Sequence, residues 1–195
     1  MSESSPRVII GVEAGQWFSD IDIKEEALSE YVESLGINPA STEIHINTED
    51  TLFETLSGEL RAIEGIYYSR SGVVTLYPYR IKRDYDLKHE AMKRMDNPEA
   101  IREKFNQYWS ERYSYFLNHE LAHKKRRVAQ GREGNESHPD FTAFELARAA
   151  LSQKDYLFNQ EEAECHAEAA VGPTDIIRFQ IRELPNERVA ADFPV

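Results

Sequence analysis

The feature that most constrains the fold is one long helical pattern that runs from Asn97 to Gly131. Asn97 can cap a helix, Pro98 suits the first helical position, and Glu99 places an acid in the first turn. The helical periodicity continues from there to Gly131, which is a stop signal. The sequence therefore predicts a helix over 98–130. Because the span is long, we also consider a break near Ser110.

Shorter patterns flank this helix. Strand patterns lie at 8–12, 43–46, 66–68 and 73–77, and the last two read as a hairpin. Helical patterns lie at 22–35, 47–60, 87–95, 141–153 and 160–171, with a loop at 131–140 and an unassigned tail from 174. Mixed elements come first and helices alone come later, which predicts an α+β fold with a helical C-terminal half. We treat 1–195 as a single domain in which 1–64 is an acidic N-terminal part.

Composition excludes several classes of protein. Hydrophobic residues make up 41% of the 195, enough for a buried core, but no apolar run approaches the roughly 20 residues of a membrane span. The N-terminus lacks a secretory signal, and Cys165 is the single cysteine, so we expect a cytoplasmic protein without an intrachain disulfide. A net charge of −12 makes nucleic acid an unlikely partner, although residues 65–132 hold 15 basic and eight acidic side chains.

The strongest chemical signal lies inside the long helix, where the chain reads His119-Glu120-Leu121-Ala122-His123. Histidines four positions apart on a helix lie one turn apart on the same face, so both imidazoles can bind one metal ion. Glu120 follows the first histidine and is placed to take a proton from a metal-bound water. The motif thus predicts a zinc site with Glu120 as a general base.

A catalytic zinc site needs a third protein ligand, and the acidic helix at 160–171 offers several. At 100° per residue, small residues share one narrow face of this helix, namely Ala163, Ala167, Ala170 and Val171. A face of alanines allows close approach of another helix, and Glu164 lies on its rim. Glu164 is therefore our predicted ligand, while Glu161, Glu162 and His166 remain alternatives.

A HExxH motif followed by Glu-x-x-Ala-Glu on a second helix resembles the gluzincin metallopeptidases, and here that second motif begins at Glu164. The resemblance covers about residues 65–172 and implies a zincin-like fold, with a small mixed sheet or hairpin packed on the metal-binding helix. It implies His119, His123 and Glu164 as zinc ligands, with Glu168 supporting a ligand histidine. The stretch 160–173 also resembles the related helix of ImmA/IrrE-like regulatory peptidases, whose ligand position would fall on Gln160.

Two functions follow from these observations. The first is a zinc-dependent peptidase that acts on a peptide or protein substrate, in which a metal-activated water attacks the scissile carbonyl. The second is a non-catalytic regulatory or interaction protein that retains a zincin fold and its metal site. An intact Glu120 favours the first, because a purely structural site has no use for a general base. Neither the oligomeric state nor the substrate follows from the sequence.

Overall fold

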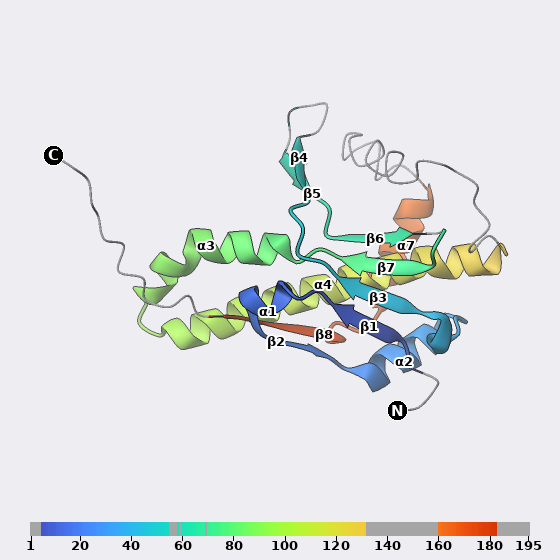
Figure 1. Cartoon of the computed structure of the whole chain (residues 1–195), viewed down its shortest axis with the longest axis horizontal. Coiled ribbons are helices and arrows are strands. Elements are labelled where there is room, and N and C mark those ends of the chain that lie inside the picture. The colour runs from blue at the N-terminus through green and yellow to red at the C-terminus, as the bar shows by residue number, and fades with distance from the viewer. Residues whose placement is uncertain (1–4, 55–57, 59, 69, 132–159, 183–195) are drawn as a thin grey trace.

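The computed structural model describes residues 5–54, 58, 60–68, 70–131 and 160–182. It has an α+β fold, as predicted, with a four-stranded mixed sheet in the order β1-β3-β7-β6 (Figure 1). The strands are β1 (Arg7–Ile10), β3 (Glu43–Ile46), β7 (Val73–Leu76) and β6 (Gly65–Tyr68). The first three are parallel, and β6 is an edge strand antiparallel to β7. The acidic N-terminal part thus contributes two strands to the same sheet as residues 65–76.

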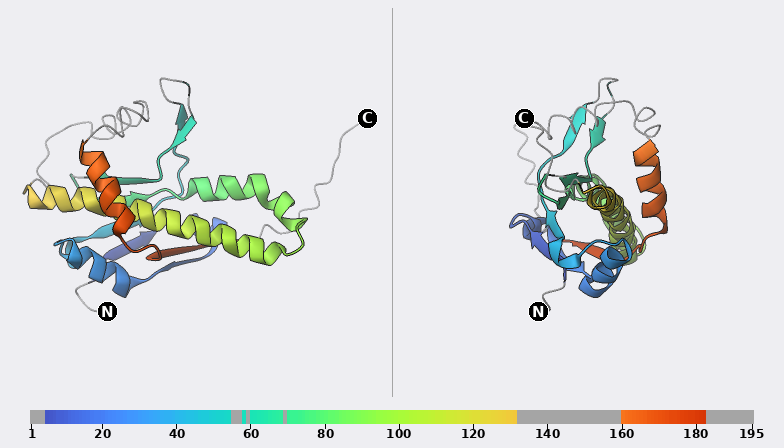
Figure 2. Two further views of the ribbon diagram at one scale, coloured as in Figure 1. Left: turned by 180° about the vertical axis from the view of Figure 1, so that it is seen from behind. Right: turned by 90° about the vertical axis from the view of Figure 1, so that its right-hand side faces the viewer.

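The helix α4 (Pro98–Ala129) is continuous and forms the centre of the molecule. It lies between the four-stranded sheet and α7 (Gln160–Val171), as the two views in Figure 2 show. Asn97 caps it by accepting a hydrogen bond from Ala100 N (3.1 Å), and Gly131 ends it with a positive φ of 64°. Residues 117–122 are all buried, because the four-stranded sheet, the strand at 177–181 and α7 cover α4 on different sides.

A row of polar side chains, one per turn of α4, holds the strand β8 (Ile177–Ile181). Asn106 Oδ1, Ser110 Oγ and Ser114 Oγ accept hydrogen bonds from the backbone N–H groups of Ile181, Phe179 and Ile177. One turn further on, Asn118 donates to the carbonyl of Pro173 (2.9 Å). The break that we considered near Ser110 does not occur. The Ser110 hydroxyl donates to Asn106 O and accepts from Phe179 N of β8 while the helix continues.

β8 also pairs antiparallel with β2 (Phe18–Ile23) in a separate two-stranded sheet. Its buried and exposed residues alternate, with Ile177, Phe179 and Ile181 facing the core. The core between α4, β8 and the sheet includes Tyr113, whose hydroxyl donates to Tyr77 O at 2.5 Å. The prediction of an entirely helical C-terminal half is therefore wrong, because β8 is a strand.

The remaining elements surround this core. They are α1 (Ala14–Trp17), α2 (Glu25–Ser34), the 3₁₀ helix η1 (Pro39–Ser41), α3 (Tyr79–Lys93), and the pair β4 (Leu52–Glu54) and β5 (Leu60–Ala62).

The helix predicted over 47–60 is wrong, since β4 and β5 form an antiparallel pair there. Gly58, between them, has a φ of 81°, a conformation that favours glycine and ends a helix. The predicted helix at 141–153 lies outside the described residues, within which no helix is long and apolar enough to cross a bilayer.

Candidate metal centre

The two motif histidines lie on the face of α4 that contacts α7. Their rings are nearly perpendicular, with centroids 4.8 Å apart, and their Nε2 atoms are 3.2 Å apart. Both side chains are largely buried, with exposed fractions of 5% for His119 and 13% for His123. As predicted, the spacing of four residues brings both imidazoles to one point.

Glu162 of α7 completes a three-residue cluster with these histidines. Its Oε2 lies 3.3 Å from His119 Nε2 and 3.4 Å from His123 Nε2, and its side chain is fully buried. The three atoms therefore form a nearly equilateral triangle. Among the described residues, this is the group of histidine, cysteine and acidic side chains that could hold a metal ion.

Glu164, our predicted third ligand, does not lie with the histidines. Its Oε2 accepts a hydrogen bond from Arg126 Nη1 (2.6 Å), and its side chain is 45% exposed. Hydrogen bonds from Gln160 and Arg126 lower its pKa. Glu168, predicted to support a ligand histidine, instead forms an ion pair with Lys125. Both acids thus connect α7 to the basic C-terminal turn of α4.

Glu162 takes the place predicted for Glu164 because the buried face of α7 is not the alanine face that the sequence suggested. Its buried residues are Glu162, Cys165 and Ala169, whereas Ala170 and Val171 face solvent. Alanine has little apolar area to bury, so a row of alanines only weakly determines which side of a helix faces the core. The sequence signal that could have found Glu162 is the helical stripe of Glu162, Cys165, His166 and Ala169, at positions i, i+3, i+4 and i+7.

The donor set fits a zinc ion. Two imidazole nitrogens and one carboxylate oxygen form a common ligand set of catalytic zinc sites. Zinc–ligand distances of about 2.0–2.1 Å in tetrahedral geometry separate neighbouring donor atoms by about 3.3–3.4 Å. The observed separations of 3.2, 3.3 and 3.4 Å match that value. His119, His123 and Glu162 would therefore hold the ion with little rearrangement.

The second ring nitrogen of His123 has its own partners. Nδ1 lies 3.3 Å from Glu161 Oε1 and 3.6 Å from Cys165 Sγ. Burial disfavours the imidazolium, but these hydrogen bonds and the charge of Glu120 outweigh burial and raise the pKa of His123 to about 10. In the absence of a metal, His123 is therefore an imidazolium at neutral pH, and a metal bound at Nε2 would displace one proton. Glu161, and not Glu168, is thus the acid in contact with a motif histidine, where it could orient the ring for metal binding.

His166 stacks on His119 without joining the ligand cluster. Their ring centroids are 4.3 Å apart, and His166 Nδ1 lies 2.6 Å from the hydroxyl of Tyr115. Burial, with electrostatic interactions from His119 and His123, lowers the pKa of His166 to about 4, so this ring is neutral at pH 7. Tyr115 and His166 together fix the plane against which the His119 ring rests.

Glu120 points from α4 to the edge strand of the sheet. Its Oε2 accepts a hydrogen bond from Tyr67 N of β6 (2.7 Å), and the residue is buried. The edge strand β6 therefore supplies a backbone donor to the Glu120 carboxylate. Gly65 makes room for the carboxylate, because a Cβ there would lie 3.0 Å from Glu120 Cγ and 3.4 Å from Oε1.

We expect Gly65→Ala to displace Glu120 without changing the metal ligands. The new methyl group would also lie 3.3 Å from Leu76 Cδ2, so the Glu120 side chain has to shift. The contact distances require a shift of a few tenths of an ångström. If Glu120 is the general base, turnover should fall measurably, but by less than the roughly 100-fold that a misplacement of about 1 Å costs. Turnover and zinc content would be measured on the same sample, with Gly15→Ala as a control because no atom lies within 4 Å of a Cβ at Gly15. Wild-type turnover in Gly65→Ala would refute this role for Gly65.

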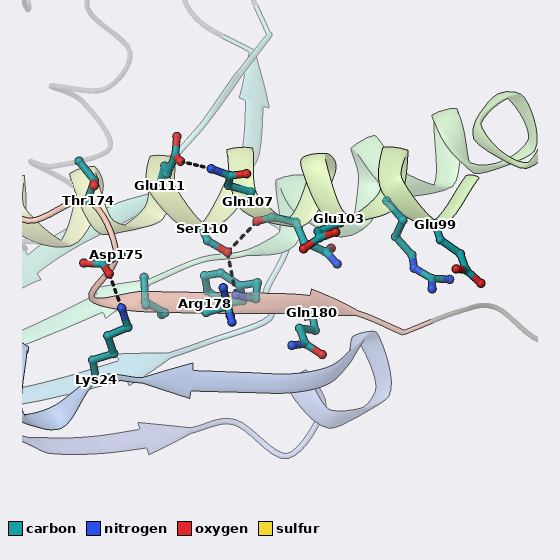
Figure 3. Close-up of a pocket in the computed structure, with 14 residues that line it drawn as sticks. Lys24, Glu99, Glu103, Gln107, Ser110, Glu111, Thr174, Asp175, Arg178 and Gln180 are labelled. Carbon is teal, nitrogen blue, oxygen red and sulfur yellow. Dashed lines mark hydrogen bonds and ion pairs between the residues drawn. The ribbon is translucent and has the colours of Figure 1, made fainter. Parts of the chain in front are cut away.

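A polar groove on another face of α4 is separate from the cluster (Figure 3). It has a volume of about 620 Å³ and runs between α4 and β8. Its lining includes Glu103, Gln107 and Glu111 of α4 and Arg178 of β8, but none of His119, His123 and Glu162. Lys24 and Asp175 form an ion pair at one end. The groove therefore does not form the metal site.

No protein-family model, no curated protein and no solved structure matches this chain. The functional argument therefore rests on the geometry of the site and on the residues that form it.

Proposed function

We propose that the protein is a zinc-dependent peptidase of zincin type that cleaves peptide bonds. The observation that carries the proposal is the triangle of His119 Nε2, His123 Nε2 and Glu162 Oε2, with Glu120 beside it on the same helix. The ligand set and the glutamate that follows the first histidine are those of metallopeptidases with a HExxH motif. The HExxH half of the resemblance to gluzincins supports the proposal. The second motif does not, because the residues three and four positions after Glu162 are Cys165 and His166 in place of alanine and an acid.

Each residue has a distinct role in the proposed reaction. A zinc ion bound by the cluster would act as a Lewis acid and lower the pKa of a water molecule. Glu120 accepts the proton of the attacking water and later donates it to the leaving amine. The Tyr67 N–H donates to Oε2 of Glu120, so in this proposal Oε1 takes that proton. Tyr115 and His166 keep the ring of His119 in its binding orientation.

One observation favours the alternative of a non-catalytic regulatory or interaction protein with a structural metal site. Glu162 is fully buried and His119 is 4% exposed, and structural zinc sites are closed, whereas catalytic sites keep an open coordination position. In that case the metal would only connect α7 to α4. Chelation would then lower the free energy of unfolding, and no peptide would be cleaved under any metal condition.

Zinc removal and return would test the proposed activity. Chelator-treated protein is incubated with a mixture of peptides of varied sequence, before and after addition of one equivalent of zinc, and products are identified by mass spectrometry. We expect cleavage only after zinc addition, because the ligand set argues for one ion per chain. A His119→Ala protein purified in the same way controls for contaminating peptidases. Absence of cleavage by the zinc-loaded protein, or cleavage that chelation leaves unchanged, would refute the proposal.

A further inference from the structure

The face of α4 that carries His119 continues toward the helix N-terminus as a strip of partly exposed side chains. The residues at i−3, i−4, i−7 and i−11 from His119 share its side of the helix, namely Phe116, Tyr115, Arg112 and Tyr108. Tyr108 is 55% exposed and the Arg112 side chain is 37% exposed. This strip, from Tyr108 to Phe116, is partly exposed surface of α4 on the N-terminal side of His119.

Arg112 is the charged residue of the strip, and its guanidinium is held in place by aromatic rings. Its Cζ lies 5.0 Å from the centroid of the Phe116 ring and 6.0 Å from that of Trp109. Its Nε is buried and has no hydrogen-bond acceptor among the described residues. Stacking on aromatic faces leaves the edge of a guanidinium available for two parallel hydrogen bonds to a carboxylate.

The acid next to Arg112 does not neutralise it. Glu64 Oε1 is 3.7 Å from Arg112 Nη2, and the same oxygen receives the shorter ion pair from Arg80 Nη1. Within the described part of the chain, two guanidinium groups thus share one carboxylate, which leaves one positive charge uncompensated. Glu64 is itself fixed, because its carbonyl accepts a hydrogen bond from Tyr77 N at 2.9 Å.

We propose that Arg112, with Arg80 beside it, binds a carboxylate of the substrate, so that the enzyme prefers acidic peptides. This inference rests on the proposed function, which places the cleaved bond at the metal cluster. Arg112 and His119 are seven residues apart, or about 10 Å along the helix. An extended peptide covers this distance in about three residues. The carboxylate is therefore an acidic side chain, or the C-terminus of the peptide, about three residues from the cleaved bond.

Equilibrium binding tests this inference without requiring cleavage. The probes are blocked alanine-rich hexapeptides that carry one Asp or one Asn, and a third peptide that has a free C-terminal carboxylate and no acidic side chain. Binding to zinc-loaded protein is followed by tryptophan fluorescence. Trp109 lies next to Arg112, and a Trp17→Phe background removes the signal of the second tryptophan. We expect the Asp peptide to bind about 10-fold or more tightly than the Asn peptide, as for a charge-assisted pair. The third peptide shows whether a C-terminal carboxylate serves equally well.

Variants of the protein test whether Arg112 causes the preference for the Asp peptide over the Asn peptide. Arg112→Gln should abolish it, and Arg112→Lys, which keeps the charge but loses the paired donors, should weaken it. Arg83→Gln removes one exposed positive charge from α3 and should keep the wild-type preference. Equal binding of the Asp and Asn peptides, including no binding of either, would overturn the inference, as would an unchanged preference in Arg112→Gln. Binding with the expected preference but no hydrolysis would support the subsite and refute the peptidase proposal.

Discussion

Replacing Glu162 by alanine should abolish zinc binding, whereas replacing Glu164 by alanine should leave it nearly unchanged. Glu162 Oε2 lies within 3.4 Å of both histidine nitrogens, whereas Glu164 pairs with Arg126 at the surface. Loss of a residue that only orients a ligand weakens metal binding by about 10–100-fold, so loss of the ligand itself should exceed about 100-fold. Competition with a chromophoric chelator measures these affinities.

Glu161→Gln provides an intermediate case for the same measurement. Glu161 contacts His123 Nδ1 and does not belong to the ligand cluster, so we expect a loss of about 10-fold or more. Glu162→Gln keeps the shape of the side chain and guards against misfolding of the alanine variant. Equal zinc affinity in the Glu162 and Glu164 variants would contradict the assignment of the third ligand.

Replacing Glu120 by glutamine should remove catalysis and retain the metal. The amide has nearly the same shape, and its carbonyl oxygen can still accept the hydrogen bond from Tyr67 N. It cannot act as a base, and general acid–base catalysis contributes about 10²–10⁴-fold to turnover. Turnover is measured on a peptide that the wild type cleaves, with the zinc content of each sample determined in parallel.

The matched control is Glu111→Gln, which makes the same change on an exposed part of α4 away from the cluster. It should retain wild-type turnover and zinc content. If Glu120→Gln also retained wild-type turnover while fully loaded with zinc, Glu120 would not be the base. A structural role for the metal would instead leave both variants, like the wild type, without activity.

The bounds of several helices and strands can be predicted from the sequence, because periodicity, capping residues and stop signals agree there. The strand at 43–46 and the helix at 160–171 have the predicted bounds, and α4 ends within one residue of its predicted end. Asn97 and Gly131 mark the ends of α4 by their own backbone and side-chain chemistry, independently of tertiary contacts. The placement of both histidines on one helical face follows from their spacing alone.

Other features depend on contacts between distant parts of the chain. Which face of α7 is buried is decided by its packing on α4, and its alanines carry too little apolar area to show this in the sequence. The polar residues Asn106, Ser110 and Ser114 look unfavourable inside a helix until β8 supplies their partners. For β8 itself a signal was present, because Ile177, Phe179 and Ile181 alternate with Arg178 and Gln180.

X-ray absorption spectroscopy of the zinc-loaded protein tests the central claim most directly, because it identifies the atoms bound to the metal. We expect a first shell of nitrogen and oxygen at about 2.0–2.1 Å with the outer-shell scattering of two imidazoles, from His119 and His123. In Glu162→Ala protein, this pattern should be lost together with the zinc. A sulfur ligand at about 2.3 Å, as Cys165 would give, or a shell without imidazole would contradict the proposed metal centre.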